Sequence, residues 1–206
     1  LTRQDVIDRV CLSGIFLALF LVSALRVNVG NDYMRYVEFY ADLCFRIPDS
    51  MSMEAGAMVE PFATAMFAAE TAEVQKGDSV LIMGSGCIGL MTLLACRYKG
   101  AENVILCDLE DIRLNKAMEL GASAVVNNGK CSEEAFYAEV RRLTDGGPRV
   151  VIEATGNAVT IRQSGELARR GGVVVLLGMP PEDVIPFNIN AIMDNEVQIR
   201  PIFRYR

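Results

Sequence analysis

Three glycines follow an apolar stretch at a spacing that suits the binding of a dinucleotide. Gly84, Gly86 and Gly89 form the pattern GxGxxG within the sequence SVLIMGSGCIGL. The first glycine permits a tight turn, the second lets a pyrophosphate approach the backbone, and the third lets a helix pack closely on the preceding strand. The N–H groups of Cys87 and Ile88, at the start of that helix, would then point at the phosphates. Alone, the pattern is weak support, because glycines are common in turns.

An acidic residue at the end of the next apolar stretch strengthens this interpretation. Asp108 ends the sequence VILCD, about 20 residues after the glycines, where a carboxylate can accept both ribose hydroxyls of an adenosine. Its charge would repel a 2′-phosphate, which favours NAD over NADP. The alternative is an ordinary turn residue at a strand end. Two later turns, EATG and LLGMP, would place Thr155, Gly156 and Gly178 beside the same cofactor.

The elements that must position these residues alternate regularly from about residue 53 onward. We expect strands at Val80–Met83, Val104–Asp108, Ala124–Asn127, Val150–Glu153, Val173–Leu177 and Val197–Phe203. We expect helices between them at Cys87–Tyr98, Ile112–Glu119, Glu133–Thr144 and Val159–Arg169. Short apolar strands alternating with helices predict an α/β fold, a doubly wound parallel sheet of the Rossmann type with helices on both faces.

Residues 1–52 do not follow this pattern. The run at residues 10–25, VCLSGIFLALFLVSAL, is almost entirely apolar. As a helix it would span roughly 24 Å, short of the roughly 30 Å hydrocarbon core of a membrane. Arg3 and Arg9 before it imitate a signal peptide, but Asp5 and Asp8 dilute their charge. We therefore expect a cytoplasmic protein, with membrane attachment or secretion through residues 10–25 as the minor alternative.

Composition excludes several kinds of chemistry. The net charge of −6 argues against a nucleic-acid partner, which usually requires a basic face. None of the six cysteines stands in a CxxC pair or at a zinc-site spacing. The chain contains no histidine, which excludes Ser-His-Asp and Cys-His catalysis by this chain alone.

Five segments together resemble the medium-chain dehydrogenase/reductase superfamily, and within it the branch of sorbitol (L-iditol) and related polyol dehydrogenases. They are MVEPFATA, VLIMGSGCIGL, CDLEDIRLNKAMELGASAVVN, VIEATGNAVTIRQSGELARRGGVVVLLGMP and IFRYR, within residues 32–206. The resemblance implies a GroES-like β domain with a catalytic zinc and a Rossmann domain that binds NAD(H). The implied reaction is reversible hydride transfer from a secondary alcohol, such as sorbitol, L-iditol or a similar polyol, to NAD, giving a ketone.

The resemblance also assigns cofactor-binding roles, residue by residue. Gly84, Gly86 and Gly89 match the pyrophosphate loop, and Asp108 matches the ribose-binding acid. Arg113 matches a basic residue near the adenosine. Two later turns match segments that touch the cofactor, the second beside the nicotinamide. Their residues are Thr155, Gly156, Leu177, Gly178 and Met179.

Three further residues match positions near the chemistry. Glu60, in the sequence VEP, matches a carboxylate close to the catalytic zinc. Without the resemblance, an acid near a helix start that complements the helix dipole would be the favoured interpretation. Arg204 and Tyr205 match a pair near the substrate pocket of polyol dehydrogenases.

The family's zinc-binding cysteine and its His–Glu pair are expected before residue 1, and the family continues beyond Arg206. We therefore expect an internal fragment: residues 1–52 a remnant of the GroES-like domain, and residues 53–206 a C-terminally truncated Rossmann domain. Such a fragment should be inactive alone, while the full-length parent would bind zinc and form a homo-oligomer. Two alternatives remain open: a non-catalytic dinucleotide-binding module, and a zinc-free reductase of the same superfamily.

Overall fold

A computed structural model describes residues 48–203 of the chain. The chain divides into two compact units, residues 1–52 and residues 53–206. The second unit contains every helix and strand that the structure describes. The apolar run at residues 10–25 lies outside the described residues, and the origin of residues 1–52 as a remnant of a GroES-like domain stays a prediction.

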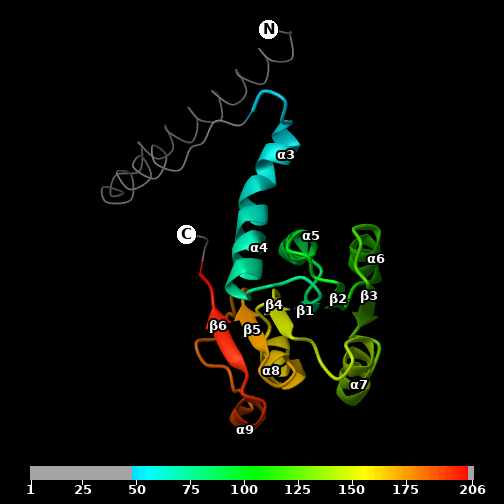
Figure 1. The fold of residues 1–206 in the computed structure, drawn as a ribbon, viewed down its shortest axis with the longest axis vertical. Helices are drawn as coiled ribbons and strands as arrows, with labels where there is room; N and C mark the ends of the chain where they lie inside the picture. Colours follow the sequence, from blue (N-terminus) through cyan, green and yellow to red (C-terminus); the bar gives the residue numbers. More distant parts are fainter. Residues whose placement is uncertain (1–47, 204–206) are drawn as a thin grey trace, which may run out of the picture. The chain divides into compact units, whose positions relative to one another are not determined.

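Six parallel strands form one sheet in the order β3-β2-β1-β4-β5-β6 (Figure 1). They are β1 Ser79–Met83, β2 Asn103–Asp108, β3 Ala124–Asn127, β4 Val150–Glu153, β5 Val173–Leu176 and β6 Gln198–Pro201. The chain runs outward from β1 to β3, returns to β4 beside β1, and then runs outward the other way. This is the doubly wound order, so the predicted Rossmann-type α/β fold is confirmed.

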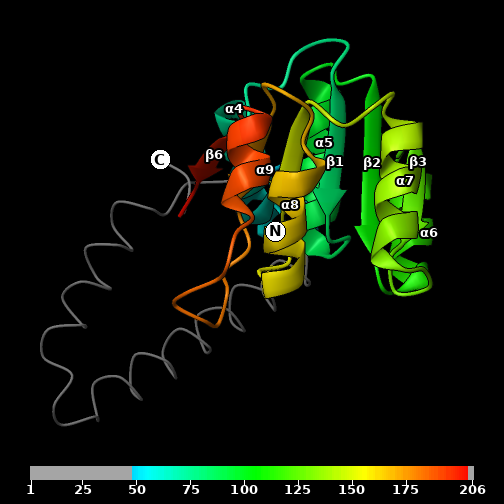
Figure 2. The same cartoon turned by 90° about the horizontal axis from the view of Figure 1, so that it is seen from below.

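Helices cover both faces of the sheet (Figures 1 and 2). The helices in chain order are α3 Met53–Ala57, α4 Val59–Thr71, α5 Cys87–Tyr98, α6 Asp111–Glu119, α7 Glu133–Leu143, α8 Ala158–Leu167 and α9 Ile189–Asp194. Buried residues of α4, α5 and α6 pack on one face, and those of α7 and α8 pack on the other, with α9 against it. No helix among residues 48–203 is long and apolar enough to cross a membrane.

The central parts of β1, β2, β4 and β5 are apolar because both faces of these strands are covered. In β1, Val80 and Ile82 pack on the side of α4, α5 and α6, while Leu81 and Met83 pack on the side of α7 and α8. All four side chains are fully buried. The same alternation runs through β2, β4 and β5. Continuous apolar strands of this kind are typical of a parallel sheet between two helical layers.

Two predicted elements differ from the structure by more than one residue at an end, and one helix was not predicted. The helix expected to reach Arg169 ends at Leu167, because Ala168 adopts an extended conformation and the N–H of Arg169 bonds to the carbonyl of Pro148. The strand expected at residues 197–203 is shorter, Gln198–Pro201, and Val197 instead donates its N–H to the end of α9. Helix α9 itself was not predicted; it is short and follows a proline-containing loop.

An ion pair fastens the amino end of the sheet. Arg149, just before β4, contacts the carboxylate of Asp78, just before β1, through two guanidinium nitrogens. The same guanidinium donates to the carbonyl of Glu73, beyond the end of α4. Both charged side chains are largely buried, so the contact ties α4 and two strands together at the edge opposite the strands' carboxyl ends.

Candidate functional site

The glycine-rich turn joins β1 to α5, and its three glycines have different surroundings. Gly84 has a φ of +103°, a left-handed conformation that favours glycine, and donates its N–H to the carbonyl of Cys107. A Cβ on Gly89 would lie 1.9 Å from the carbonyl oxygen of Gly84, so this glycine lets the helix approach the turn. A Cβ on Gly86 would meet nothing within 4 Å. Gly84 and Gly89 are therefore needed by the fold, whereas Gly86 leaves space open at the start of a helix.

Asp108 lies beside this turn at the end of β2. Its Oδ2 accepts a hydrogen bond from the backbone N–H of Ser85 at 2.7 Å, and its Oδ1 accepts one from Glu110 at 3.0 Å. The Arg113 guanidinium lies 3.7 Å from Oδ1, and the Asp108 side chain is 8% exposed. Each carboxylate oxygen can accept more than one hydrogen bond, so this arrangement orients Asp108 without exhausting its capacity for ligand hydroxyls.

A buried carboxylate organises the turn after β4. Glu153 is fully buried, and its Oε1 accepts hydrogen bonds from the Thr155 N–H at 2.9 Å and the Thr160 hydroxyl at 2.9 Å. Its Oε2 accepts the Gly156 N–H at 3.1 Å. These hydrogen bonds to the carboxylate fix the conformation of the turn and hold Thr155 at the carboxyl end of the sheet.

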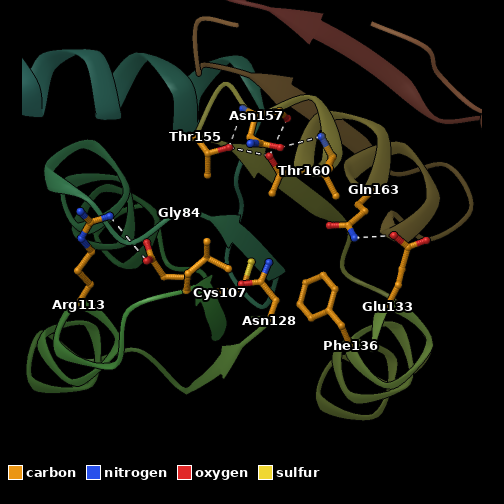
Figure 3. Close-up of a pocket in the computed structure, with 13 residues that line it drawn as sticks. Gly84, Cys107, Arg113, Asn128, Glu133, Phe136, Thr155, Asn157, Thr160 and Gln163 are labelled. Carbon is orange, nitrogen blue, oxygen red and sulfur yellow. Dashed lines mark hydrogen bonds and ion pairs between the residues drawn. The ribbon is translucent and has the colours of Figure 1, made fainter. Parts of the chain in front are cut away.

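A cavity of about 600 Å³ opens where β1, β2, β3 and β4 end (Figure 3). Four of its lining residues were predicted from the sequence: Gly84, Asp108, Arg113 and Thr155. The structure therefore brings together one residue from the carboxyl end of each of β1, β2 and β4 and one from α6. A ligand hydroxyl in the cavity could reach the Asp108 carboxylate while its neighbouring groups lie against Thr155.

The other predicted cofactor residues do not line this cavity. Cys87 is exposed at the first turn of α5 and Ile88 follows it, so their position suits the phosphates rather than the cavity. Leu177, Gly178 and Met179 lie beyond β5, with Met179 exposed.

Gly156 packs directly against the turn beyond β5. A Cβ on Gly156 would lie 2.4 Å from the carbonyl oxygen of Met179, and a Cβ on Gly178 would lie 2.0 Å from the N–H nitrogen of Gly156. The turns after β4 and β5 therefore touch through their backbones. Contact of Leu177, Gly178 and Met179 with a nicotinamide stays a prediction.

Sequence reasoning missed most of the cavity wall. The additional lining residues are Cys107, Leu109, Asn128, Glu133, Phe136, Asn157, Val159, Thr160 and Gln163. Several belong to α7 and α8, where Phe136 and Gln163 occur at positions that a helical pattern would assign to the core. The signal that could have found them is the group of polar residues Thr160, Gln163 and Ser164 on the buried face of α8.

A polar network joins α7 to α8 beside the cavity. Arg162 forms ion pairs with Glu133 and Glu166, and Gln163 donates from Nε2 to Glu133 Oε2 at 2.9 Å. The hydrogen bonds from Arg162 and then Gln163 lower the pKa of Glu133. Partial burial, followed by the hydrogen bond to Glu166, raises the pKa of Tyr137 above its ordinary value. These contacts fix the relative position of two helices that form the cavity wall.

The predicted catalytic and metal residues are not brought into this site by the described structure. Glu60 is exposed in the first turn of α4. Arg204 and Tyr205 lie outside the described residues. Among residues 48–203, no three side chains of His, Cys, Asp or Glu gather closely enough to hold a metal ion. The described residues therefore do not fit a zinc site, and we derive no chemical step through zinc.

Comparison with known proteins gives the class of this chain. Residues 87–206 match the family of zinc-binding dehydrogenases, and the chain belongs to that family. It is 36% identical over 178 residues to sorbitol dehydrogenase of Bacillus subtilis, a match that covers 86% of this chain and 50% of that protein. The chain thus spans about half the length of the curated relatives it matches.

Solved structures agree with this placement. The 2R,3R-butanediol dehydrogenase of Bacillus subtilis superposes with a TM-score of 0.72 at 33% identity, covering 79% of this chain and 46% of that one. A Sinorhizobium meliloti protein described as a zinc-binding dehydrogenase, bound to NADP, superposes with a TM-score of 0.72 at 32% identity, covering 78% and 47%. The resemblance to the dehydrogenase superfamily that the sequence indicated is confirmed.

Proposed function

We propose that this chain is the coenzyme-binding part of an NAD-dependent polyol dehydrogenase. The adenosine ribose of NAD would lie against Asp108, the pyrophosphate at the start of α5, and the base in the cavity of about 600 Å³. In the whole protein the bound NAD accepts hydride from a secondary alcohol. The relatives named for sorbitol and butanediol support this substrate class.

The observation that carries the proposal is the hydrogen bond from the Ser85 N–H to Asp108 at 2.7 Å. This bond holds a largely buried carboxylate beside Ser85, the residue before Gly86. Of the three glycines in the turn, Gly86 is the one where an added Cβ would meet open space. A carboxylate next to an uncrowded helix start provides acceptors for ribose hydroxyls and donors for phosphate oxygens in one place.

Selectivity for NAD over NADP follows from the same carboxylate. A 2′-phosphate would lie close to Asp108, whose two oxygens carry a negative charge. Arg113 offers a compensating charge, but its side chain is 55% exposed and already lies 3.7 Å from Asp108. We therefore assign NAD to this chain, although one related structure holds NADP.

The remaining features of the whole protein are part of the same proposal. Zinc would come from ligands other than the described residues, as in a family of zinc-binding dehydrogenases. We place the protein in the cytoplasm, acting on small polyols and not on nucleic acid, in keeping with its net charge of −6. We also propose a homo-oligomer for the whole protein.

Titration with NADH tests the proposal directly. The chain contains no tryptophan, so the increase in NADH fluorescence on binding can be followed against a low protein background. We expect saturable binding that ADP-ribose displaces, because the adenosine half carries most of the contacts. Absence of saturable NADH binding by the folded chain would contradict the proposal. The polyol reaction is tested separately, with sorbitol and NAD, on the protein expressed from its complete reading frame.

A further inference from the structure

The inner wall of the cavity contains a side-chain amide whose oxygen has no partner. Gln163 on α8 lines the cavity and is only 5% exposed. Its Oε1 is buried and, within the described part of the chain, accepts no hydrogen bond. Asn128, on the loop after β3, also lines the cavity, and its Oδ1 is likewise buried without a partner there. Two residues that line the same cavity therefore each have a buried amide oxygen without a donor from the described residues.

The orientation of the Gln163 amide is fixed by its other contact. Its Nε2 donates to Glu133 Oε2 at 2.9 Å, and Glu133 is also paired with Arg162. That pairing keeps the pKa of Glu133 low, so the carboxylate is ionised and can only accept hydrogen bonds. Turning the amide would set its oxygen against the carboxylate. Oε1 therefore stays directed away from Glu133, as Figure 3 shows.

A buried acceptor without a donor destabilises the protein, and a ligand that supplies an N–H removes that penalty. We propose that Gln163, assisted by Asn128, recognises the exocyclic amino group of the coenzyme's adenine and selects 6-aminopurines over 6-oxopurines. This inference rests on the proposed function, because it requires a dinucleotide whose ribose lies at Asp108.

The chemistry of the two bases gives the discrimination. Adenine has an amino group at C6, with two N–H donors for the unpaired oxygens. Hypoxanthine has an oxygen at the same atom, which would face Oε1 and leave it unpaired. The apolar side chains of Phe136, which is buried, and of Val159, which is 52% exposed, border the cavity and can cover the faces of a flat base. These apolar contacts contribute equally to the affinity for either base, so the difference in affinity comes from the two amide side chains.

Comparison of NADH with reduced nicotinamide hypoxanthine dinucleotide tests this assignment. The two coenzymes share ribose, pyrophosphate and nicotinamide and differ only at the purine. We expect the unaltered chain to bind NADH about tenfold more tightly, the scale of one lost hydrogen bond between buried groups. In Gln163→Leu the ratio should fall to about twofold. Gln198→Leu, on β6 and outside the cavity lining, is the matched control and should keep the original ratio.

A second variant distinguishes a hydrogen bond between Gln163 and the base from a role of Gln163 in packing alone. Glu133→Ala removes the acceptor that fixes the amide, so Gln163 can turn and donate Nε2 to the oxygen of hypoxanthine. The ratio should then shrink through tighter binding of the hypoxanthine coenzyme, a gain that a purely structural role would not produce. This variant also decides the matter if circular dichroism shows that Gln163→Leu does not fold.

The binding measurements distinguish a failure of this base recognition from a failure of the proposed function. Saturable NADH binding with equal affinity for the two coenzymes overturns the base recognition and leaves the proposed function standing. A Gln163→Leu chain that is folded and loses affinity for both coenzymes by the same factor overturns it as well. A folded chain that binds neither coenzyme overturns the proposed function and this inference together.

Discussion

Asp108 accepts the backbone N–H of Ser85 at 2.7 Å, and this single hydrogen bond joins the end of β2 to the glycine-rich turn after β1. The two segments are 23 residues apart in the sequence. The contact orients one carboxylate oxygen toward the turn, where a ribose and a pyrophosphate would meet. It therefore couples the two motifs that the sequence suggested separately.

The first prediction concerns this carboxylate. Asp108→Ala should weaken NADH binding by about 1–3 kcal/mol, because hydrogen bonds to a charged group are lost. It should affect NADPH less, since the repulsion of the 2′-phosphate disappears with the charge. Fluorescence titration with both coenzymes measures the change. Glu119→Ala is the control, because it removes an equal charge from an exposed position on α6. Equal affinity of the unaltered chain for NADH and NADPH would contradict the assignment.

The second prediction contrasts two glycines three residues apart. Gly86→Val should leave the fold intact, because its Cβ meets nothing within 4 Å, but should abolish NADH binding by filling the space for the pyrophosphate. Gly89→Ala should destabilise the protein by about 3 kcal/mol or more, because its Cβ would lie 1.9 Å from a carbonyl oxygen. An alanine inside a helix would otherwise stabilise it. Calorimetry and circular dichroism compare the two, and a valine variant that binds NADH normally would show that Gly86 has no role in binding.

The third prediction concerns the buried acid after β4. Glu153→Gln replaces one acceptor oxygen by an amino group amid the N–H donors of Thr155 and Gly156. We expect a loss of about 1–3 kcal/mol in the free energy of unfolding, measured in urea. Glu119→Gln, an exposed position on α6, should change it little. Unchanged stability of Glu153→Gln would mean that the network around the carboxylate does not support the turn.

The fourth prediction uses the cysteines as reporters. Burial raises the pKa of the Cys107 thiol to about 12, and burial likewise raises the pKa of Cys96 to about 12, so neither should react with iodoacetamide at pH 8 in the folded protein. Cys87 and Cys131 are exposed and should react. NADH should slow the reaction of Cys87, at the start of α5, and leave Cys131 as the internal control. Peptide mass mapping measures each site, and equal protection of both would contradict the placement of the pyrophosphate.

The raised pKa values of these two thiols also predict how the free energy of unfolding changes at alkaline pH. The folded state disfavours the thiolates, so the stability contributed by Cys96 and Cys107 is fully present below the ordinary pKa of 9.0. It is lost as the pH rises from there toward about 12. Replacing Cys107 by alanine should flatten this alkaline decline in the urea midpoint. A decline that is as steep in the variant would show that other groups cause it.

The sequence was informative where signals are local. The glycines, Asp108 and the alternation of strands with helices depend on near neighbours, and they were enough to predict the doubly wound sheet. Gln163 and Phe136 were missed because a residue on a buried helix face can point into a core or into a cavity, and only the crossing of α7 and α8 decides which. The end of α8 was also missed, because Ala168 favours helix locally, whereas the next residue, Arg169, bonds to Pro148 across the fold.

The ion pair of Arg149 with Asp78 lies at the amino end of the sheet, whereas the cavity lies at the carboxyl end. A five-residue strand such as β1 separates the two ends by roughly 16 Å, so substitutions at one end have few direct contacts with the other. The sheet thereby separates the ion pair that fastens the fold from the residues that line the cavity. If the proposed function holds, exchanging residues around the cavity should alter coenzyme preference while the Arg149–Asp78 contact at the opposite end is kept.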